Sequence, residues 1–380
     1  VDIDPVALAA ARRQLPDAEL LLADALGGDV DALAPGTADL VVGNPPFLSQ
    51  LAATTTRRGA SAHGGGPYAD TAAEFLAVAI RAARPDGGRV GLVLPQSLLA
   101  SRDAGPVRAE VDRLATMTWS WWSPRQVFDD ARVLVCALAF ERRPDVAPAP
   151  WTAVITGAMG VPALPALTTD GRLGDHARLT ANFRDEYYAL VPAVVEAGAG
   201  APLITSGLID PGRCRWGERS ITFARRRLGR PSVERDLLTP AMQRWADDLL
   251  VPKVLIANQC RVIEAVVDET GSWLPGVPVI TARPADATAA WKVAAVLTSP
   301  VASAWAWRRA AGTGRSASSL RLGPRWLADL PWPGGSLQPA VDALRAGDLA
   351  ATGRGVSTAY GVGPPAAAEL QRWWVRNLPG

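Results

Sequence analysis

Short apolar runs and stretches of helical periodicity alternate along the first part of the chain. Three apolar runs predict strands, at Leu40–Val42, Arg89–Pro95 and Leu134–Phe140. Apolar residues three and four positions apart predict helices that begin near Pro5, Asp70 and Val107. This alternation is typical of an α/β fold, in which a run such as Leu40–Val42 is buried on both faces of a parallel sheet.

A Pro- and Ala-rich stretch, Pro144–Pro150, marks a change in this pattern. Beyond it, the chain consists of shorter segments broken by Gly and Pro. They include a predicted strand at Val251–Ile256 and a predicted helix from Ala289 to Leu297. We therefore predict an α/β domain over residues 1–145 and a mixed α+β domain over residues 151–380.

Composition excludes some classes of protein. The net charge of +2 over 380 residues argues against a generally basic nucleic-acid coat, so any nucleic-acid surface must be a local patch. The three cysteines lie too far apart to form a metal pattern, and the two histidines are too few for a His-based metal site. Such sparse cysteines favour a reducing compartment. No apolar run approaches the ~18 residues of a membrane span. We expect a cytoplasmic protein with no metal and no membrane partner.

The run Leu40–Val42 ends at a stiff polar corner. Gly43 lets the backbone leave the strand, and Pro45 and Pro46 fix φ and carry no N–H group. Asn44 lies at the carboxyl end of the strand, where open α/β sheets bind ligands, and Phe47 adds an aromatic face. The Asn44 side-chain carbonyl and the Pro45 backbone carbonyl could accept both N–H bonds of one amino group. The simpler alternative is a strand followed by a Pro-rich turn.

The sequence Asn44-Pro45-Pro46-Phe47 resembles the catalytic motif of amino-methyltransferases that use S-adenosylmethionine, above all the N6-adenine DNA methyltransferases. The resemblance implies a Rossmann-like catalytic domain with S-adenosylmethionine as cofactor. It also implies that Asn44 and Pro45 orient the target amine. Phe47 would then stack on a base that has been taken out of the duplex.

The same resemblance implies a cofactor site at two other strand ends. In Val1-Asp2-Ile3-Asp4-Pro5, Asp2 would accept hydrogen bonds from ribose hydroxyls and Ile3 would lie against the cofactor adenine. Asp24, after a predicted strand at Glu19–Ala23, would receive the adenine amino group. Asp4 is better interpreted as the N-cap of the following helix, and the alternative for Asp24 is also a cap or turn residue.

One part of the resembled pattern is missing. The family places a Gly-rich turn on a first strand about 20 residues before the acidic ribose ligand, and this sequence starts at that ligand. We therefore expect an N-terminally truncated chain that binds the cofactor poorly. After Phe47, residues 48–67 form a long small-residue stretch that we interpret as a flap over the substrate, with His63 solvated rather than catalytic.

The TaqI-type adenine methyltransferases carry a β-hairpin whose final Phe packs on the target base from the side opposite the motif aromatic. Phe140 occupies the corresponding place here. The alternative role for Phe140 is that of a core residue at a strand end.

Arginines are densest in the predicted second domain. Four of them are candidates for contacts with DNA phosphates: Arg225, Arg226, Arg227 and Arg230. Trp216 and Phe223 are interleaved with them, and the alternative is a solvated Arg-rich face. A "PKVL" strand, a helix ending in Ser-Pro and an "LPWP" segment resemble the target-recognition region of restriction–modification methyltransferases.

These observations favour a site-specific adenine-N6 DNA methyltransferase of a restriction–modification or phage-defence system. Its expected partners are double-stranded DNA and a companion restriction endonuclease or specificity subunit. Protein-glutamine and ribosomal RNA guanine-N2 methyltransferases share Asn-Pro-Pro-aromatic motifs and remain alternatives. A non-catalytic DNA-binding remnant is a further alternative of a different class.

Overall fold

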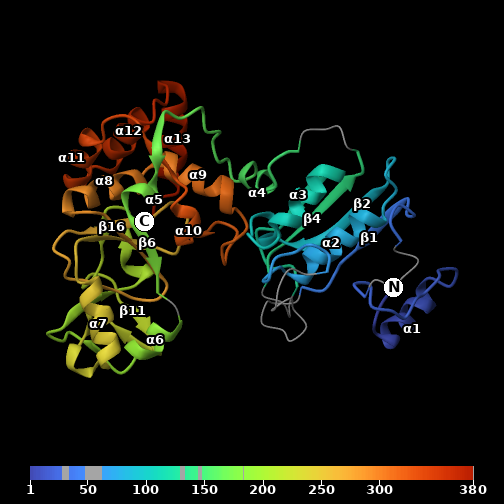
Figure 1. The fold of residues 1–380 in the computed structure, drawn as a ribbon, viewed down its shortest axis with the longest axis horizontal. Helices are drawn as coiled ribbons and strands as arrows, with labels where there is room; N and C mark the ends of the chain where they lie inside the picture. Colours follow the sequence, from blue (N-terminus) through green and yellow to red (C-terminus); the bar gives the residue numbers. More distant parts are fainter. Residues whose placement is uncertain (28–33, 48–61, 129–132, 144–147, 183, 380) are drawn as a thin grey trace. The chain divides into compact units, whose positions relative to one another are not determined.

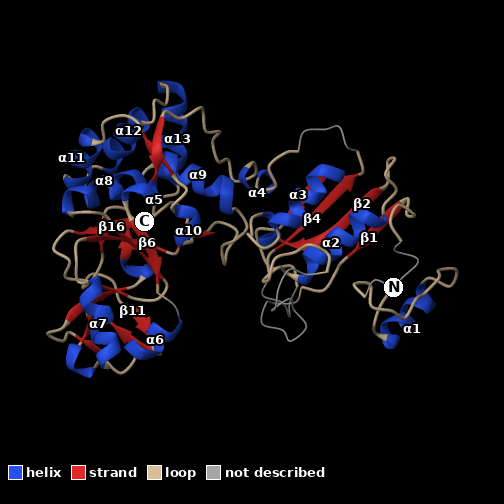
Figure 2. Cartoon of the chain, in the orientation of Figure 1, coloured by secondary structure: helices blue, strands red, loops and turns tan. Residues whose placement is uncertain are grey.

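The computed structural model describes residues 1–27, 34–47, 62–128, 133–143, 148–182 and 184–379. The chain divides into two compact units, Val1–Ile155 and Thr156–Gly380. Both units combine helices and strands, so the fold is mixed α/β (Figures 1 and 2). The expected flap at residues 48–67 lies outside the described residues up to position 61.

Unit 1 is built around a four-stranded sheet in the order β1-β2-β4-β3. Its elements in chain order are α1 (Pro5–Gln14), β1 (Leu40–Gly43), α2 (Thr71–Ala82), β2 (Arg89–Pro95), the 3₁₀ helix η2 (Gln96–Leu99), α3 (Gly105–Leu114), β3 (Thr116–Trp122), β4 (Val135–Glu141) and α4 (Ala153–Thr156), which crosses into unit 2. β1 and β2 run parallel, and β4 is antiparallel to both of its neighbours. The predicted strands at β1, β2 and β4 are confirmed.

The core of unit 1 lies on one side of β2 and β4. Alternate side chains on these strands, such as Leu92, Leu94 and Leu138, are buried, as is the inner face of α2. The predicted start of α2 is confirmed, because the Asp70 carboxylate accepts a hydrogen bond from the Ala72 N–H and caps the helix. Burial raises the pKa of Asp70 above its ordinary value, although the Ala72 hydrogen bond opposes the shift.

The expectation that β1 is buried on both faces is wrong. Leu40 is 60% exposed and Val42 is 70% exposed. The reason is topological: β1 lies at the end of the sheet order, and among the described residues it pairs only with β2. An apolar run predicts a strand, but the number of its neighbours depends on the rest of the sheet.

The N-terminal segment contains less strand than the sequence predicts. The two expected strands are reduced to one parallel bridge between Asp2 and Leu22. The helix between them, α1, is confirmed, and its predicted N-cap is Asp4, which accepts a hydrogen bond from Val6 N–H at 2.8 Å. None of the α1 residues is buried.

Unit 2 contains two four-stranded sheets, ordered β17-β8-β13-β7 and β16-β14-β18-β6, and several two-stranded ladders. Its strands are β5 (Thr169–Arg172), β6 (Arg178–Ala181), β7 (Val194–Glu196), β8 (Ala201–Ile204), β9 (Ile209–Asp210), β10 (Arg213–Cys214), β11 (Ile221–Phe223), β12 (Arg226–Leu228), β13 (Pro231–Val233), β14 (Lys253–Ala257), β15 (Gln259–Cys260), β16 (Ala265–Asp268), β17 (Leu274–Pro275), β18 (Val279–Arg283), β19 (Leu320–Arg321) and β20 (Pro331–Pro333).

The helices of unit 2 are α5 (Leu173–His176), α6 (Arg184–Leu190), η3 (Ser206–Leu208), η4 (Arg235–Leu237), α7 (Pro240–Leu249), α8 (Ala287–Leu297), α9 (Pro300–Ala310), α10 (Pro324–Leu327), α11 (Gln338–Arg345), α12 (Leu349–Ala359) and α13 (Pro364–Arg376). The predicted helix at Ala289–Leu297 is confirmed as α8. It is separate from α9, because Ser299 caps a new helix that begins with Pro300. The predicted strand at Val251–Ile256 is β14, which is buried along its whole length.

Candidate functional site

The carboxyl end of β1 places the Asn-Pro-Pro-Phe residues at the edge of the unit 1 sheet. Asn44 and Pro46 are exposed, Pro45 is buried and Phe47 is half-buried. β1 pairs in parallel with β2, with Gly43 opposite Leu92. Pro45 is therefore packed inside the protein, whereas the Asn44 side chain is accessible. Asn44 lies at the edge of the sheet where open α/β sheets bind ligands.

A second aromatic ring lies beside Phe47. The ring centroids of Phe47 and Phe128 are 6.0 Å apart, with an angle of 56° between the ring planes. Phe128 is half-buried and belongs to the connection between β3 and β4. The sequence interpretation missed Phe128. One feature of the sequence could have indicated it. Phe128 is an aromatic residue in a connection between two strands, where the alternation of buried and exposed residues along a strand does not account for it.

Phe140 has different surroundings from those expected of a base-stacking residue. It is 2% exposed, it lies opposite Val90 on β2, and its ring packs 5.4 Å from the ring of Trp151. These are the surroundings of the alternative role, a core residue. Of the two phenylalanines in this part of the chain, the one next to Phe47 is Phe128.

Gln96 ties down the connection that carries Phe128. Its side-chain amide donates hydrogen bonds to the carbonyls of Ser123 (2.7 Å) and Val135 (3.0 Å), and its backbone N–H donates to the Leu134 carbonyl (2.8 Å). Gln96 is 1% exposed. Because it follows the last residue of β2, it fixes both ends of the β3–β4 connection to the same sheet edge as Asn44.

The predicted cofactor residues Asp2, Ile3 and Asp24 come together at the parallel bridge. Asp2 pairs with Leu22, so the strand end at Ile3 lies beside the one that precedes Asp24. Asp2 Oδ1 accepts a hydrogen bond from Asp4 N–H (2.8 Å), and Asp24 Oδ1 accepts one from Leu26 N–H (2.9 Å). Both carboxylates therefore close local turns, which is the alternative considered for Asp24. Ile3 is 71% exposed.

His63 connects the Asp24 turn to the segment that follows the motif. A ring nitrogen of His63 lies 2.9 Å from the Leu26 carbonyl oxygen. The His63 and Gly65 N–H groups donate to the carboxylate of Glu74 at 3.2 and 3.1 Å, and Glu74 is 4% exposed on α2. His63 is half-buried rather than solvated as expected, because these contacts hold it against α2 and the Asp24 turn.

Seven arginines between positions 213 and 230 fall into two groups. Three of them form ion pairs with Asp210 or Glu218: Arg213, Arg215 and Arg219. Although burial opposes the shift, hydrogen bonds from Arg215 and Arg219 lower the pKa of Asp210. The four predicted DNA-binding arginines form the second group and are all exposed: Arg225, Arg226, Arg227 and Arg230. Within the described residues, none of these four forms an ion pair.

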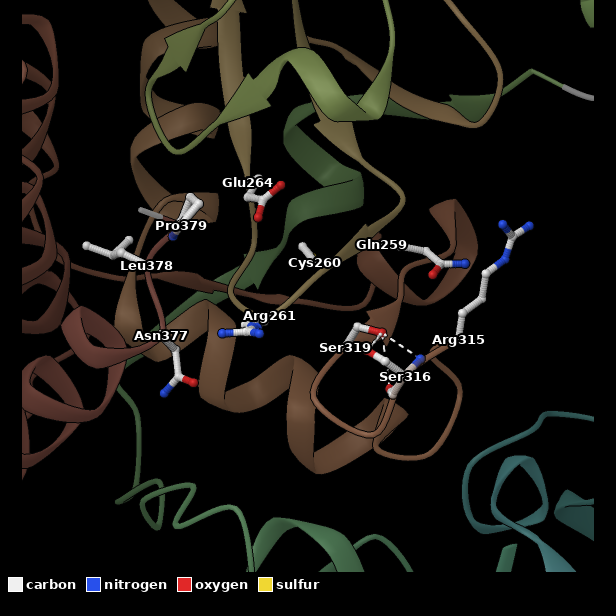
Figure 3. Close-up of a pocket in the computed structure, with 10 residues that line it drawn as sticks. All are labelled: Gln259, Cys260, Arg261, Glu264, Arg315, Ser316, Ser319, Asn377, Leu378 and Pro379. Carbon is white, nitrogen blue, oxygen red and sulfur yellow. Dashed lines mark hydrogen bonds between the residues drawn. The ribbon is translucent and has the colours of Figure 1, made fainter. Parts of the chain in front are cut away.

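A polar pocket of about 600 Å³ opens in unit 2 (Figure 3). Its lining residues are Gln259, Cys260, Arg261, Glu264, Arg315, Ser316, Ser319, Asn377, Leu378 and Pro379. Burial and the nearby Asp210 raise the pKa of Glu264 to about 8, although Arg219 opposes the shift. The sequence interpretation did not predict this pocket, because it joins segments far apart in the chain.

Within the described residues, no three or more His, Cys, Asp and Glu side chains are grouped so that they could hold a metal ion. In the same part of the chain, no helix is both long and apolar enough to cross a membrane.

No family model and no curated protein matches this sequence. Among solved structures, the type IIL restriction-modification enzyme MmeI in complex with DNA is similar over 98% of this chain and 59% of its own, with 11% identity and a TM-score of 0.47. The type IIG restriction endonuclease BpuSI is similar over 94% of this chain and 56% of its own, with 10% identity and a TM-score of 0.37.

The M protein of the type I restriction enzyme EcoKI is similar over 32% of this chain and 23% of its own, with 24% identity and a TM-score of 0.26. All three neighbours are thus restriction or restriction–modification proteins. The chain spans less than two thirds of the length of each of them. Every TM-score lies below 0.5, so these likenesses do not by themselves assign a function.

Proposed function

We propose that this chain carries the catalytic and target-recognition parts of a DNA adenine-N6 methyltransferase that uses S-adenosylmethionine, within a restriction–modification or phage-defence system. One observation carries the proposal. Asn44 and Pro45 follow β1 at the carboxyl edge of a parallel strand pair, and two aromatic rings, Phe47 and Phe128, lie together just after them.

Asn44 and Pro45 supply the acceptors that an exocyclic amine requires. The amine of adenine is a poor nucleophile, because its lone pair is delocalised into the ring. Hydrogen bonds from its two N–H groups to the Asn44 side-chain carbonyl and the Pro45 backbone carbonyl would localise that lone pair and aim it. The rigid Pro45-Pro46 corner fixes the backbone around the Pro45 carbonyl and directly follows Asn44, so we propose that catalysis is mainly positioning and electrostatic stabilisation.

Phe47 and Phe128 would hold the base. A base removed from the duplex loses its stacking partners, and stacking on an aromatic side chain restores about 1–3 kcal/mol per base. Both residues are half-buried, so part of each remains accessible to a ligand. We propose that Phe128, rather than Phe140, is the second aromatic residue that contacts the base.

Asp2, Ile3 and Asp24 fit the adenosine part of the cofactor. Each of the two carboxylates uses Oδ1 for its own turn, and carboxylates have further acceptor capacity for hydroxyl or amino donors. Ile3 offers an exposed apolar side chain for an adenine ring. When bound, S-adenosylmethionine supplies an activated methyl group on a sulfonium. The protein residues bind the cofactor, orient the amine and exclude water.

The exposed arginines of unit 2 support DNA as the substrate. Arg225, Arg226, Arg227 and Arg230 carry positive charge that no carboxylate within the described residues neutralises by an ion pair. Arginines that contact DNA phosphates must carry such unpaired positive charge. Because these contacts release counterions from the DNA, the affinity for DNA falls as the salt concentration rises. A restriction endonuclease or a specificity subunit remains the partner that we propose for the assembled system.

The decisive test of the proposal is the identity of the methylated product. The protein from its complete reading frame is incubated with labelled S-adenosylmethionine and, in separate reactions, with a pool of duplex DNA, with ribosomal RNA or with a cell protein extract. The products are then digested for mass spectrometry. We expect N6-methyl-2′-deoxyadenosine. Label in N4-methyl-2′-deoxycytidine, in guanine N2 of ribosomal RNA or in a protein glutamine would instead assign the motif to another amine or amide and overturn the adenine proposal.

A second candidate is a DNA-binding protein without catalytic activity. It is favoured by the single-bridge pairing at Asp2 and the 71% exposure of Ile3, which leave little formed surface for a cofactor. Calorimetry with S-adenosylmethionine separates the two candidates. Binding by the protein from its complete reading frame supports the enzyme, whereas DNA binding without cofactor binding supports the second candidate.

A further inference from the structure

The β11–β12 hairpin of unit 2 projects an arginine from its tip. β11 and β12 pair antiparallel, with Ile221 opposite Leu228, Thr222 opposite Arg227 and Phe223 opposite Arg226. The turn between the strands consists of Ala224 and Arg225 alone. In such a two-residue hairpin, the residues of the turn form the extreme end of the ribbon.

The turn is strained at both positions. Ala224 has φ of 47° and Arg225 has φ of 63°, and neither residue is a glycine. A hairpin turn with two positive φ values usually contains Asn-Gly or Gly-Gly, because a Cβ atom disfavours this backbone region. Strained positions of this kind persist only where the surroundings fix them, and they concentrate at functional sites.

The surroundings do fix this turn. Phe223 is 3% exposed and Leu228 is 5% exposed, so one face of the hairpin is anchored in the core of unit 2. The Tyr187 hydroxyl accepts a hydrogen bond from the Ala224 N–H at 3.2 Å, and the Tyr187 ring lies 5.0 Å from that of Phe223. The backbone is therefore held, while the Arg225 side chain is exposed.

The contacts of the other arginines single out Arg225 and Arg227. Arg226 lies on the anchored face with Phe223 and donates to the Val194 carbonyl at 2.6 Å. Arg230 lies over the Trp216 ring, 5.8 Å from its centroid. Arg227 faces outward with Thr222 and donates through Nε to the Ser220 hydroxyl at 2.9 Å, which leaves its two terminal nitrogens for other partners.

We propose that the β11–β12 hairpin enters the major groove of double-stranded DNA, with Arg225 contacting the edge of a guanine and Arg227 contacting a phosphate. The inference rests on the proposed function in one respect, that this chain binds duplex DNA. The major groove, about 12 Å wide, admits a two-stranded β-ribbon. Arginine binds O6 and N7 of guanine through two hydrogen bonds, the commonest specific contact in that groove.

This assignment gives the two arginines different roles. Arg225 at the tip determines which base pair is preferred, whereas Arg227 on the side of the ribbon adds affinity that is independent of sequence. It also accounts for an arginine at a position where the backbone favours glycine. Within the described residues, Arg225 forms no ion pair that would otherwise explain its presence.

The test compares four variants of the 380-residue chain by selection from a duplex library with about 20 randomised base pairs, the order of length of a protein-bound site. Arg225→Gly removes the side chain and relieves the turn, and its matched control, Ala224→Gly, relieves the turn without removing a candidate contact. Arg227→Gln removes a charge at the ribbon, and its matched control, Arg213→Gln, removes one already paired with Glu218. Thermal unfolding establishes that each variant folds.

We expect Arg225→Gly to lose the preference for guanine at one position and to bind the best wild-type sequence roughly 5- to 150-fold more weakly. Arg227→Gln should keep the preferred sequence, and the slope of log affinity against log salt should fall by about 1. Ala224→Gly and Arg213→Gln should match the wild type in both measurements, and both glycine variants should unfold at or above the wild-type temperature.

Three outcomes would overturn the assignment, and they are distinguishable. An unchanged preferred sequence for Arg225→Gly with normal affinity would place the DNA elsewhere on unit 2. Uniform weakening with the preference intact would make Arg225 a phosphate contact. Failure of the wild-type chain to bind any duplex would refute DNA binding itself, and with it the proposed function.

Discussion

β1 in unit 1 and β14 in unit 2 are both predicted from short apolar runs, yet they have opposite surroundings. β14 pairs with β16 on one side and β18 on the other, and all five of its residues are buried. β1 pairs with β2, and Leu40 and Val42 are mostly exposed. The same local pattern therefore produces an interior strand in one unit and an edge strand in the other.

We infer that β14 contributes mainly to the stability of the fold, whereas β1 carries residues that a ligand can reach. β14 even holds a buried ion pair, with Lys253 Nζ 2.5 Å from Asp268 Oδ2 and both side chains at most 1% exposed. Such a strand can change little without loss of folding. β1 instead ends in an exposed corner whose side chains are available to a ligand. The two strands should therefore respond differently to equivalent substitutions.

Substitution of Lys253 should have the largest effect on stability. Lys253→Met leaves the Asp268 carboxylate buried without its cation, which should lower the free energy of unfolding by about 3–5 kcal/mol. The control is Lys292→Met on the exposed surface of α8, where a change within about 0.5 kcal/mol is expected. Urea denaturation measures both, and equal values would contradict the assignment of β14 as a closed interior strand.

The phenylalanines of unit 1 sharpen the same contrast. Phe140→Ala should cost about 3–5 kcal/mol of folding free energy, because it opens a cavity beside Trp151. Phe128→Ala and Phe47→Ala should destabilise the fold less but abolish the fluorescence change of 2-aminopurine at the target base. If Phe140→Ala left stability intact and removed that signal, the roles given to Phe140 and Phe128 would have to be exchanged.

Glu264 predicts a pH dependence for unit 2. Its folded pKa of about 8 lies above its ordinary value of 4.5, so the unfolded chain releases this proton first. The contribution of Glu264 to stability is then fully present below pH 4.5, and it falls as pH rises towards 8. Glu264→Gln should match the wild type near pH 4.5 and exceed it at pH 8, by an amount on the order of 1–4 kcal/mol. If the difference in unfolding free energy between Glu264→Gln and the wild type stayed constant from pH 4.5 to pH 8, the raised pKa of Glu264 would be contradicted.

The smallest predicted effect compares the two strands directly. Val254→Thr buries a hydroxyl in β14, where Val254 is 0% exposed, and should cost about 1–3 kcal/mol. Val42→Thr introduces the same group in β1, where Val42 is 70% exposed, and should change stability by less than about 0.5 kcal/mol. Chemical denaturation measures the free energy of unfolding of both variants. An equal loss of stability in Val42→Thr and Val254→Thr would contradict the comparison.

The sequence predicts the features that depend on neighbouring residues. The N-cap at Asp4 and the start of a helix at Asp70 depend on local hydrogen bonds, so the residue types near them are informative. The strand–corner unit at Asn44 is likewise contiguous in sequence. Its position at the carboxyl end of a parallel strand could therefore be predicted before any tertiary contact was known.

The features that the sequence does not predict depend on segments far apart in the chain. The exposure of β1 depends on which strands flank it, and the buried position of Phe140 depends on Trp151. Phe128 meets Phe47 only because the β3–β4 connection, tied down by Gln96, lies at the end of β1. Similarly, the arginines of unit 2 have equal formal charge in the sequence, and only their tertiary partners distinguish paired from unpaired ones.

The most direct test of the central claim is methyl transfer by Asn44→Ala. The protein from its complete reading frame and this variant are compared in single-turnover reactions with duplex DNA, and DNA binding is measured in parallel. The proposed role of Asn44 predicts a rate lowered by at least about 100-fold, as for loss of one preorganised hydrogen-bonding group at a reacting centre, with DNA binding unchanged. Methylation at the wild-type rate by Asn44→Ala would contradict the assignment of this strand end as the catalytic site.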